Sequence, residues 1–190
     1  MNLKEILRYL GYGQNEPEDR MVELIKECYD ELLKAAEPKH VAKRVDISVS
    51  EDGQIRLGDV SLTSKDLAKN LMGCHEAVVF ATTLGIGTDM LMNRFVKLDI
   101  AKASVLQACG AAMIEDYIDE YQKGLSEELS EAGLTHRPRF SPGFGDFYLE
   151  YQKVIFQILN PEKNIGVHLT DGGVMIPEKS VTAIIGIKRK

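Results

Sequence analysis

Cysteine is scarce in this 190-residue chain, and the three that occur, Cys28, Cys74 and Cys109, are far apart. Their odd number and the absence of any CxxC or HxxxH spacing indicate neither a disulfide framework nor a known zinc motif. We interpret them as reduced, mostly buried thiols of a cytoplasmic protein. A zinc site built from Cys74, His75 and His136 is the weaker alternative.

An excess of basic charge is also missing. The 23 lysines and arginines are outnumbered by 29 aspartates and glutamates, which leaves a net charge of −6. Because nucleic-acid binding needs cations that neutralise phosphates, DNA and RNA are not expected as partners. The one basic run, at residues 188–190, is typical of a solvated tail.

Long hydrophobic runs are absent as well. No segment approaches the roughly 18 consecutive apolar residues of a membrane span, and the first residues lack the apolar stretch of a signal peptide. We therefore expect a cytoplasmic protein with no membrane partner. Its 44% hydrophobic and 27% charged residues suit one folded domain with a substantial core.

Hydrophobic periodicity predicts a mixture of helices and strands. Helices are expected at about 2–10, 17–37, 64–72, 89–96, 100–121 and 147–159, with a short polar helix between Gly124 and Gly133. Strands are expected at 45–49 and 55–57 as a hairpin, at 77–81, and at 165–170 and 181–187 joined by a turn at 171–173. This order is not a βαβ alternation. We predict a single α+β domain with a mostly antiparallel, twisted sheet and several packed helices.

Residues 84–88, LGIGT, follow a predicted strand and open a helix, as a phosphate-binding turn would. The dinucleotide fingerprint would require a glycine where Met90 stands, and no Walker lysine follows. Glycines in such a tight connection more often serve backbone geometry.

Catalytic motifs are sparse. The sequence contains no GxSxG and no HExxH, and its four histidines are scattered. Acidic residues cluster near the end of the 100–121 helix: Glu115, Asp116, Asp119 and Glu120. Such a cluster is normally solvated, and Glu115 alone adjoins the apolar stripe, where it would need a cationic partner. The pattern favours a binding protein over a self-sufficient catalyst.

The stretch 137–146, RPRFSPGFGD, combines stiff and permissive backbone. Pro138 and Pro142 fix φ, whereas Gly143 and Gly145 allow close approach or positive φ. Arg137 and Arg139 could grip a carboxylate with two parallel hydrogen bonds. Phe144 offers a flat apolar surface, and Asp146 is expected to cap the following helix. The stretch suits either a stiff surface loop or a loop that holds a small ligand with an anionic end and a planar end.

Arg139-x-x-Pro142-Gly143-Phe144 resembles the RxxPGY motif of the activation domain of cobalamin-dependent methionine synthase. Residues 169–177, LTDGGVMIP, and 180–183, SVTA, are similar to the LTES-x-x-MxPxxSVSG segment of that family, at matching distance. The longer form of the first motif, residues 139–146, resembles short stand-alone members. The clear match covers about residues 75–187. The resemblance implies an activation-domain-like core at 75–190 that carries the ligand loop, with the helices and hairpin of 1–74 in the same unit.

The resemblance also implies a ligand site for S-adenosylmethionine. Arg139 would pair with the ligand carboxylate, while Pro142, Gly143, Phe144 and Gly145 would form the wall around the adenosine. Phe144 stands where the family has a tyrosine, so that hydroxyl is lost. Glu115 is the expected helix carboxylate at the ligand, with Asp116 or Glu120 as alternatives if the alignment slips by a turn. No catalytic residue and no metal ligand is expected.

The function implied is reactivation of Co(II) cobalamin by reductive methylation. Methyl transfer from S-adenosylmethionine to Co(I) needs proximity and orientation rather than an acid or a base. Because nothing in the chain resembles a cobalamin module, we expect it to act in trans as an accessory component. The expected partners are a corrinoid methionine synthase without its own activation domain and a flavodoxin-like electron donor. The alternatives are a binding protein for another corrinoid protein or ligand, and an independent small-molecule methyltransferase with Asp146 or Glu115 as base.

Overall fold

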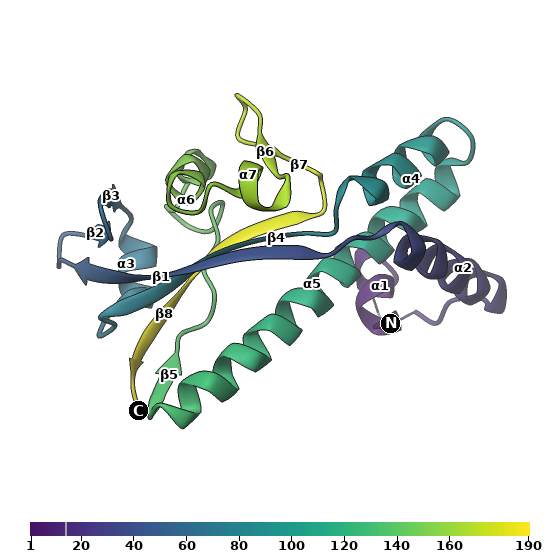
Figure 1. Ribbon diagram of the computed structural model, residues 1–190. Helices are drawn as coiled ribbons and strands as arrows, with labels where there is room; N and C mark the ends of the chain where they lie inside the picture. The colour runs from purple at the N-terminus through teal and green to yellow at the C-terminus, as the bar shows by residue number, and fades with distance from the viewer. Residues whose placement is uncertain (14) are drawn as a thin grey trace.

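A six-stranded antiparallel sheet forms the centre of the molecule (Figure 1). The computed structural model describes residues 1–13 and 15–190. The strands lie in the order β3-β2-β1-β4-β8-β5. They span Lys39–Val49 (β1), Gln54–Leu57 (β2), Val60–Thr63 (β3), Glu76–Thr83 (β4), Leu134–His136 (β5) and Ser180–Arg189 (β8). Every neighbouring pair is antiparallel, which confirms the expected single α+β domain.

Helices cover both faces of this sheet (Figure 1). One face carries α1 (Leu3–Tyr9), α2 (Asp19–Ala35), α4 (Ile86–Val96) and α5 (Ile100–Glu131), and the other carries α3 (Lys65–Leu71), α6 (Gln152–Leu159) and α7 (Pro161–Ile165). Side chains of β4 therefore enter two separate cores in alternation, Val78 and Phe80 on the α5 face and Val79 on the other. This explains the continuous apolar run in β4, which was correctly predicted to be covered on both faces.

Helix α5 is longer than the sequence pattern predicted. It continues from Ile100 to Glu131, so the expected break at Gly124 and the separate polar helix after it were wrong. A glycine within a helix costs only about 1 kcal/mol relative to alanine. Tyr121, Leu125 and Leu129 keep packing against the core at helical spacing, which offsets that cost. The helix ends before Gly133, whose φ of +70° suits a C-terminal cap.

The last strands pair differently from the prediction. The prediction of a hairpin that joins 165–170 to 181–187 was wrong, because β6 (His168–Leu169) pairs with β7 (Met175–Ile176) in a separate small ribbon. Strand β8 instead pairs with the whole length of β4, from Ser180 opposite Thr83 to Ile187 opposite Glu76. Its partner lies about a hundred residues away, so local sequence does not reveal it.

Most other predicted elements are present with shifted ends. The hairpin of β1 and β2 turns at Gly53, whose φ is +86°. Helix α3 is capped by Ser64, whose Oγ accepts the N–H of Leu67 at 3.1 Å. The helix expected from 147 starts as a 3₁₀ turn, η1 (Leu149–Tyr151), and α4 starts three residues before the predicted Asp89. Among the described residues, no helix is both long and apolar enough to cross a membrane.

Candidate functional site

The segment 137–147 follows the edge of strand β8 and then turns away from the sheet. The Arg137 N–H donates to the Gly186 carbonyl at 2.8 Å, and Phe140 and Ile184 exchange two backbone hydrogen bonds of 2.9 Å. At Gly143, whose φ is +102°, the chain reverses, and its N–H donates to the Phe147 carbonyl at 2.7 Å. Backbone pairing to the sheet therefore sets the position of the RxxPG motif.

The two arginines of this segment point to opposite faces of the sheet. Phe140 packs in the core on the α3 and α6 face, so the preceding Arg139 extends to the α5 face. Arg137 turns to the other face, where its NH2 donates to the Met72 carbonyl at 3.0 Å. The irregular backbone at Pro138 breaks the alternation that would have put both arginines on one side.

Three side chains of α5 hold the Arg139 guanidinium. Its NH1 donates to Asp119 Oδ1 at 2.9 Å and to Gln122 Oε1 at 2.5 Å, and its NH2 donates to the Glu115 carboxylate. These acceptors are four and seven residues apart, so they line one stripe of the helix. Because Arg139 and Glu115 are only 28% and 33% exposed, the pair is partly shielded from water.

The candidates for the carboxylate at the ligand were Glu115, Asp116 and Glu120, and of these Glu115 is the one that contacts Arg139. Asp116 lies toward α2. Burial is the main cause of the raised pKa of Tyr29 on that helix, and the nearby Asp116 carboxylate is the second. Glu120 lines a groove on the opposite flank of α5. Burial, followed by the Glu115 carboxylate, raises the pKa of Tyr9, which brings the end of α1 to the same cluster.

The Arg139 cluster can accept a zwitterionic group. The hydrogen bonds described use the Nη1 and Nη2 groups, and the Nε–H donates to no acceptor among the described residues. A ligand carboxylate can accept a hydrogen bond from this Nε–H, and the Glu115 oxygens nearby can accept an ammonium group.

The turn residues lie beside a different concavity. A hollow of about 550 Å³ on the α3 face is lined by Asp66, Lys69, Asn70, Arg137, Pro138, Phe140, Phe144 and Gly145. Phe144 is 62% exposed at its rim, while Pro142 is buried in the turn. Arg137, and not Arg139, lines this hollow together with Phe144 and Gly145. The predicted ligand residues are thus split between the two sides of one sheet edge.

The prediction that Asp146 caps the following helix was wrong. The Asp146 carboxylate instead accepts hydrogen bonds at the start of α3, from Ser64 Oγ at 2.5 Å and from the Lys65 and Asp66 backbone at 2.7 and 3.1 Å. The loop lies so close to α3 that a Cβ built on Gly145 would be 2.0 Å from an Asp66 oxygen. The glycine therefore permits contact between the loop and this helix.

The second motif lies next to the first. Residues 169–177 form the turn between β6 and β7, and a Cβ on Gly173 would come within 3.8 Å of the Leu149 carbonyl that follows the loop. The Ser180 hydroxyl donates to Thr83 Oγ1 at 2.8 Å and lies 2.6 Å from the Pro177 carbonyl. This motif therefore ties the start of β8 to the end of β4.

The glycine-rich turn at 84–88 is closed by its own chain. A Cβ on Gly87 would lie 2.3 Å from the Ala35 carbonyl oxygen, and the Glu37 N–H donates to the Leu84 carbonyl at 2.8 Å. These glycines allow α4 to begin against the end of α2. The structure thus accounts for them by packing.

The residues of the weaker zinc alternative are not gathered into a site. His136 Nε2 lies 2.6 Å from Ser126 Oγ, and its Nδ1 lies 2.8 Å from the Arg137 carbonyl. Cys74 is buried, with its sulfur beside Gly186. Over residues 1–13 and 15–190, no group of three or more potential ligands could hold a metal ion.

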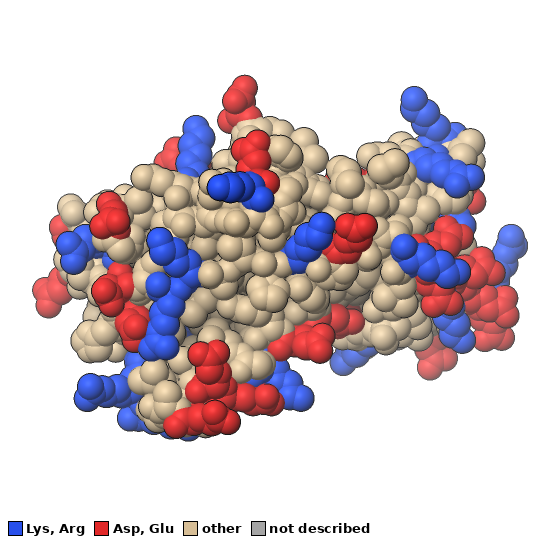
Figure 2. All heavy atoms as spheres, viewed as in Figure 1, with Lys and Arg blue, Asp and Glu red and all other residues tan. Residues whose placement is uncertain are grey.

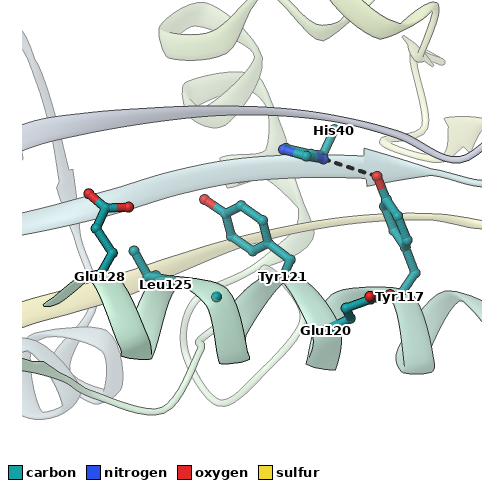
Figure 3. A pocket seen from close by; sticks show the side chains of 7 residues that line it. His40, Tyr117, Glu120, Tyr121, Leu125 and Glu128 are labelled. Atoms are coloured by element: carbon teal, nitrogen blue, oxygen red, sulfur yellow. Dashed lines mark hydrogen bonds between the residues drawn. The ribbon is translucent and has the colours of Figure 1, made fainter. Parts of the chain in front are cut away.

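Sequence reasoning missed a groove between β1 and α5. It measures about 350 Å³ and is lined by His40, Tyr117, Glu120, Tyr121, Gly124, Leu125 and Glu128 (Figure 3). The signal available in the sequence was the spacing of two tyrosines, a glycine and a leucine on one stripe of α5. The predicted helix covers only residues 100–121, so the sequence pattern did not extend this stripe to Gly124 and Leu125.

Charged side chains are interspersed on the face shown in Figure 2, and acidic groups gather at the end where α2 lies.

Comparison with known proteins supports the fold. No protein-family model matches the chain, and no curated protein matches it. Among solved structures, the chain is similar to the MetH reactivation domain, in a crystal structure with AdoHcy bound. The TM-score is 0.69 at 16% sequence identity, and the match covers 97% of this chain and 74% of the other. At this identity the likeness shows that the two chains share a fold.

Proposed function

We propose that this chain is an S-adenosylmethionine-binding module that supports the reductive methylation of Co(II) cobalamin on a separate corrinoid protein. The proposal rests above all on the Arg139–Glu115 pair, whose arginine is the first residue of the RxxPG motif, in a fold shared with the MetH reactivation domain. That domain is bound to AdoHcy, the product of methyl transfer from S-adenosylmethionine. Membership of the same family is the identity that fits these features.

The charges near Arg139 match those of the proposed ligand. S-adenosylmethionine carries a carboxylate, an ammonium and a sulfonium, and therefore one net positive charge. The guanidinium of Arg139 with the carboxylates of Glu115 and Asp119 gives one net negative charge. Arg139 would bind the ligand carboxylate and Glu115 its ammonium on the α5 face, and the nucleoside would extend past the sheet edge to the turn at 142–145, whose Phe144 and Gly145 line the hollow on the other face.

The role of the protein in this reaction is to bind and orient. The sulfonium already activates its methyl group, and Co(I) on the partner is the nucleophile, so no acid or base is required from this chain. Arg139 and Glu115 would fix the amino-acid end of the ligand. The turn, held by the Gly143–Phe147 hydrogen bond of 2.7 Å, would present the methyl group to a docked partner.

An independent methyltransferase is the less favoured function. It would need a base, and the two candidates are Asp146 and Glu115. The Asp146 carboxylate is occupied at α3, where hydrogen bonds from Ser64 and Lys65 lower its pKa and so its basicity. Glu115 is paired with Arg139. Both carboxylates are better suited to structural and binding roles.

Calorimetry with S-adenosylmethionine tests the ligand. We expect Arg139→Ala to weaken binding by roughly 1.5–3 kcal/mol, the usual contribution of a charged hydrogen bond. Arg137→Ala tests the other face of the sheet, where this side chain lines the hollow with Phe144 and Gly145. If Arg137→Ala weakens binding and Arg139→Ala does not, the ligand occupies the hollow at α3 instead. Absence of binding at millimolar ligand would contradict the proposal.

Reconstitution tests the partner. A corrinoid methionine synthase without its activation domain, in its Co(II) state, would be mixed with a flavodoxin-like reductant, S-adenosylmethionine and this chain. We expect the absorption spectrum of methylcobalamin to appear only when the chain and the ligand are both present. Ligand binding without any reactivation would instead support a binding protein for a different partner.

A further inference from the structure

The groove between β1 and α5 is separate from the Arg139 cluster. Its helical side consists of Tyr117, Tyr121 and Leu125 with two glutamates, whereas Arg139 contacts residues 115, 119 and 122. At about 100° per residue these two stripes lie on opposite flanks of α5. A ligand in the groove would therefore not compete for Arg139.

Aromatic side chains form the wall of the groove and hold one another in place. His40 Nδ1 lies 3.0 Å from the Tyr117 hydroxyl, and the rings of His40 and Tyr121 are 5.0 Å apart. Tyr121 also packs against the buried Phe80, with ring centroids 5.3 Å apart. Figure 3 shows Tyr121 reaching from α5 toward the sheet, where His40 meets Tyr117. These contacts fix the positions of the side chains in the wall.

Gly124 keeps the middle of the groove open. It lies between Glu120 and Glu128, four residues from each, and a Cβ built on it would find nothing within 4 Å. The two glutamates are thus separated by about 12 Å along the helix axis, at 1.5 Å per residue. Any larger side chain at position 124 would project into this space.

The carboxylates of the groove lack a cationic partner among the described residues. Glu120 and Glu128 form no ion pair there. Of the nearby bases of β1, Lys39 binds Glu37 and Arg44 forms a forked pair with Glu76. The hydrogen bond to Glu76, and to a smaller extent the charge of Glu128, raises the pKa of Arg44, so Glu128 lies near a cation without pairing with it. Burial and then the adjacent carboxylate raise the pKa of Tyr121, next to Glu128, and of Tyr117, next to Glu120. The groove thus combines an apolar, aromatic wall with negative charge at both ends.

We propose that this groove binds a linear aliphatic polyamine. A triamine carries an ammonium at each end of an extended chain and a third ammonium within it, and its extended length matches the separation of Glu120 and Glu128. Its terminal ammonium groups would meet these two carboxylates, and its methylene groups would lie over Gly124 and against Tyr121 and Leu125. Ammonium groups are also attracted to the faces of tyrosine rings. A neutral ligand would leave both carboxylates without a partner.

Titration of the full-length protein with spermidine, followed by calorimetry and NMR, tests this site. We expect Glu120→Gln and Glu128→Gln each to weaken binding about threefold, as for partly exposed ion pairs, and the double variant about tenfold. Gly124→Leu should weaken binding at least tenfold by filling the groove, with thermal melting as the check that the variant is folded. Glu127→Gln is the charge-matched control, because this exposed residue does not line the groove.

Two outcomes would overturn the proposal. An acidic protein attracts polycations non-specifically, so equal weakening by Glu127→Gln and Glu128→Gln would mean that spermidine follows net charge alone. Binding of 1,8-octanediol as tight as that of spermidine would mean that the groove recognises an apolar chain without its charges. NMR shifts confined to the groove residues, and lost in Gly124→Leu, would support it.

Discussion

The Asp146 carboxylate accepts a hydrogen bond of 2.5 Å from the hydroxyl of Ser64, which lies 82 residues earlier in the chain. Ser64 is itself the N-cap of α3, and Asp146 binds two further N–H groups of the same helix end. A helix N-terminus carries partial positive charge and unpaired N–H groups, so a carboxylate stabilises it. The RxxPG loop is thereby anchored to α3.

Asp146→Asn should lower the melting temperature near neutral pH. The hydrogen bond from Ser64, and then that from the Lys65 N–H, lowers the pKa of Asp146 in the folded state. A carboxyl group whose pKa is lower in the folded than in the unfolded state stabilises the protein at pH values above its unfolded-state pKa. This stabilisation is lost as the pH falls through its folded-state pKa. The higher melting temperature of the wild type should therefore approach that of Asp146→Asn as the pH falls below 3.8, the ordinary pKa of an aspartate.

Melting curves of both proteins between pH 7 and pH 3 measure this effect. Asp171→Asn is a suitable control, because Asp171 is exposed and forms no hydrogen bond among the described residues. If the melting temperatures of wild type and Asp146→Asn differed by the same amount at every pH in this range, the role assigned to the charge of Asp146 would be contradicted.

Gly124→Ala should stabilise the protein by about 0.5–1 kcal/mol. Gly124 lies within the continuous helix α5, and an added Cβ would meet nothing within 4 Å. The substitution therefore reduces the entropy of the unfolded chain without introducing a clash. Urea unfolding measures the change, and a loss of stability would show that the helix is interrupted at this position.

Gly87→Ala should have the opposite effect and lower the free energy of unfolding by about 1–3 kcal/mol, the usual range for overpacking. Here the Cβ would lie 2.3 Å from the backbone oxygen of Ala35, which cannot move without displacing the end of α2. The two variants add the same methyl group to two helices, so the difference in their unfolding free energies isolates the effect of packing. Equal effects would contradict the close contact of α4 with α2.

The three cysteines should react slowly with a thiol reagent in the folded protein. All are buried, and burial raises the pKa of Cys28 to about 11 and that of Cys109 to about 12, and also raises that of Cys74. Because the thiolate is the reactive form, little of it exists at pH 8. We expect less than one thiol to react within minutes with Ellman's reagent, and all three in guanidinium chloride. Rapid reaction of one thiol in the native state would disprove its burial.

Elements whose signals are local could be predicted from the sequence alone. The apolar run of β4, the apolar stripe of α2 and the turn at Gly53 follow from periodicity and backbone preference, and the structure has all three. The composition and order of these elements were also sufficient for the fold class. Local signals suffice here because each depends on neighbours within a few residues along the chain.

The candidate site was predictable only in part. Arg139 and Glu115 were both singled out from motifs, and the structure brings them together as an ion pair. Their role toward a ligand stays a prediction. That Arg137 lies on the opposite face, beside Phe144 and Gly145, could not be read from their spacing. It depends on the pairing of Phe140 with Ile184, whose register sets the face of each side chain.

Only the tertiary structure decided the remaining relationships. It pairs β8 with β4, brings Asp146 to the end of α3, and carries α5 through Gly124 against the sheet. In each case a contact between residues distant in sequence outweighs a local preference. Burial and backbone pairing over a whole sheet stabilise the fold by more than the roughly 1 kcal/mol that separates local alternatives at a glycine or a cap.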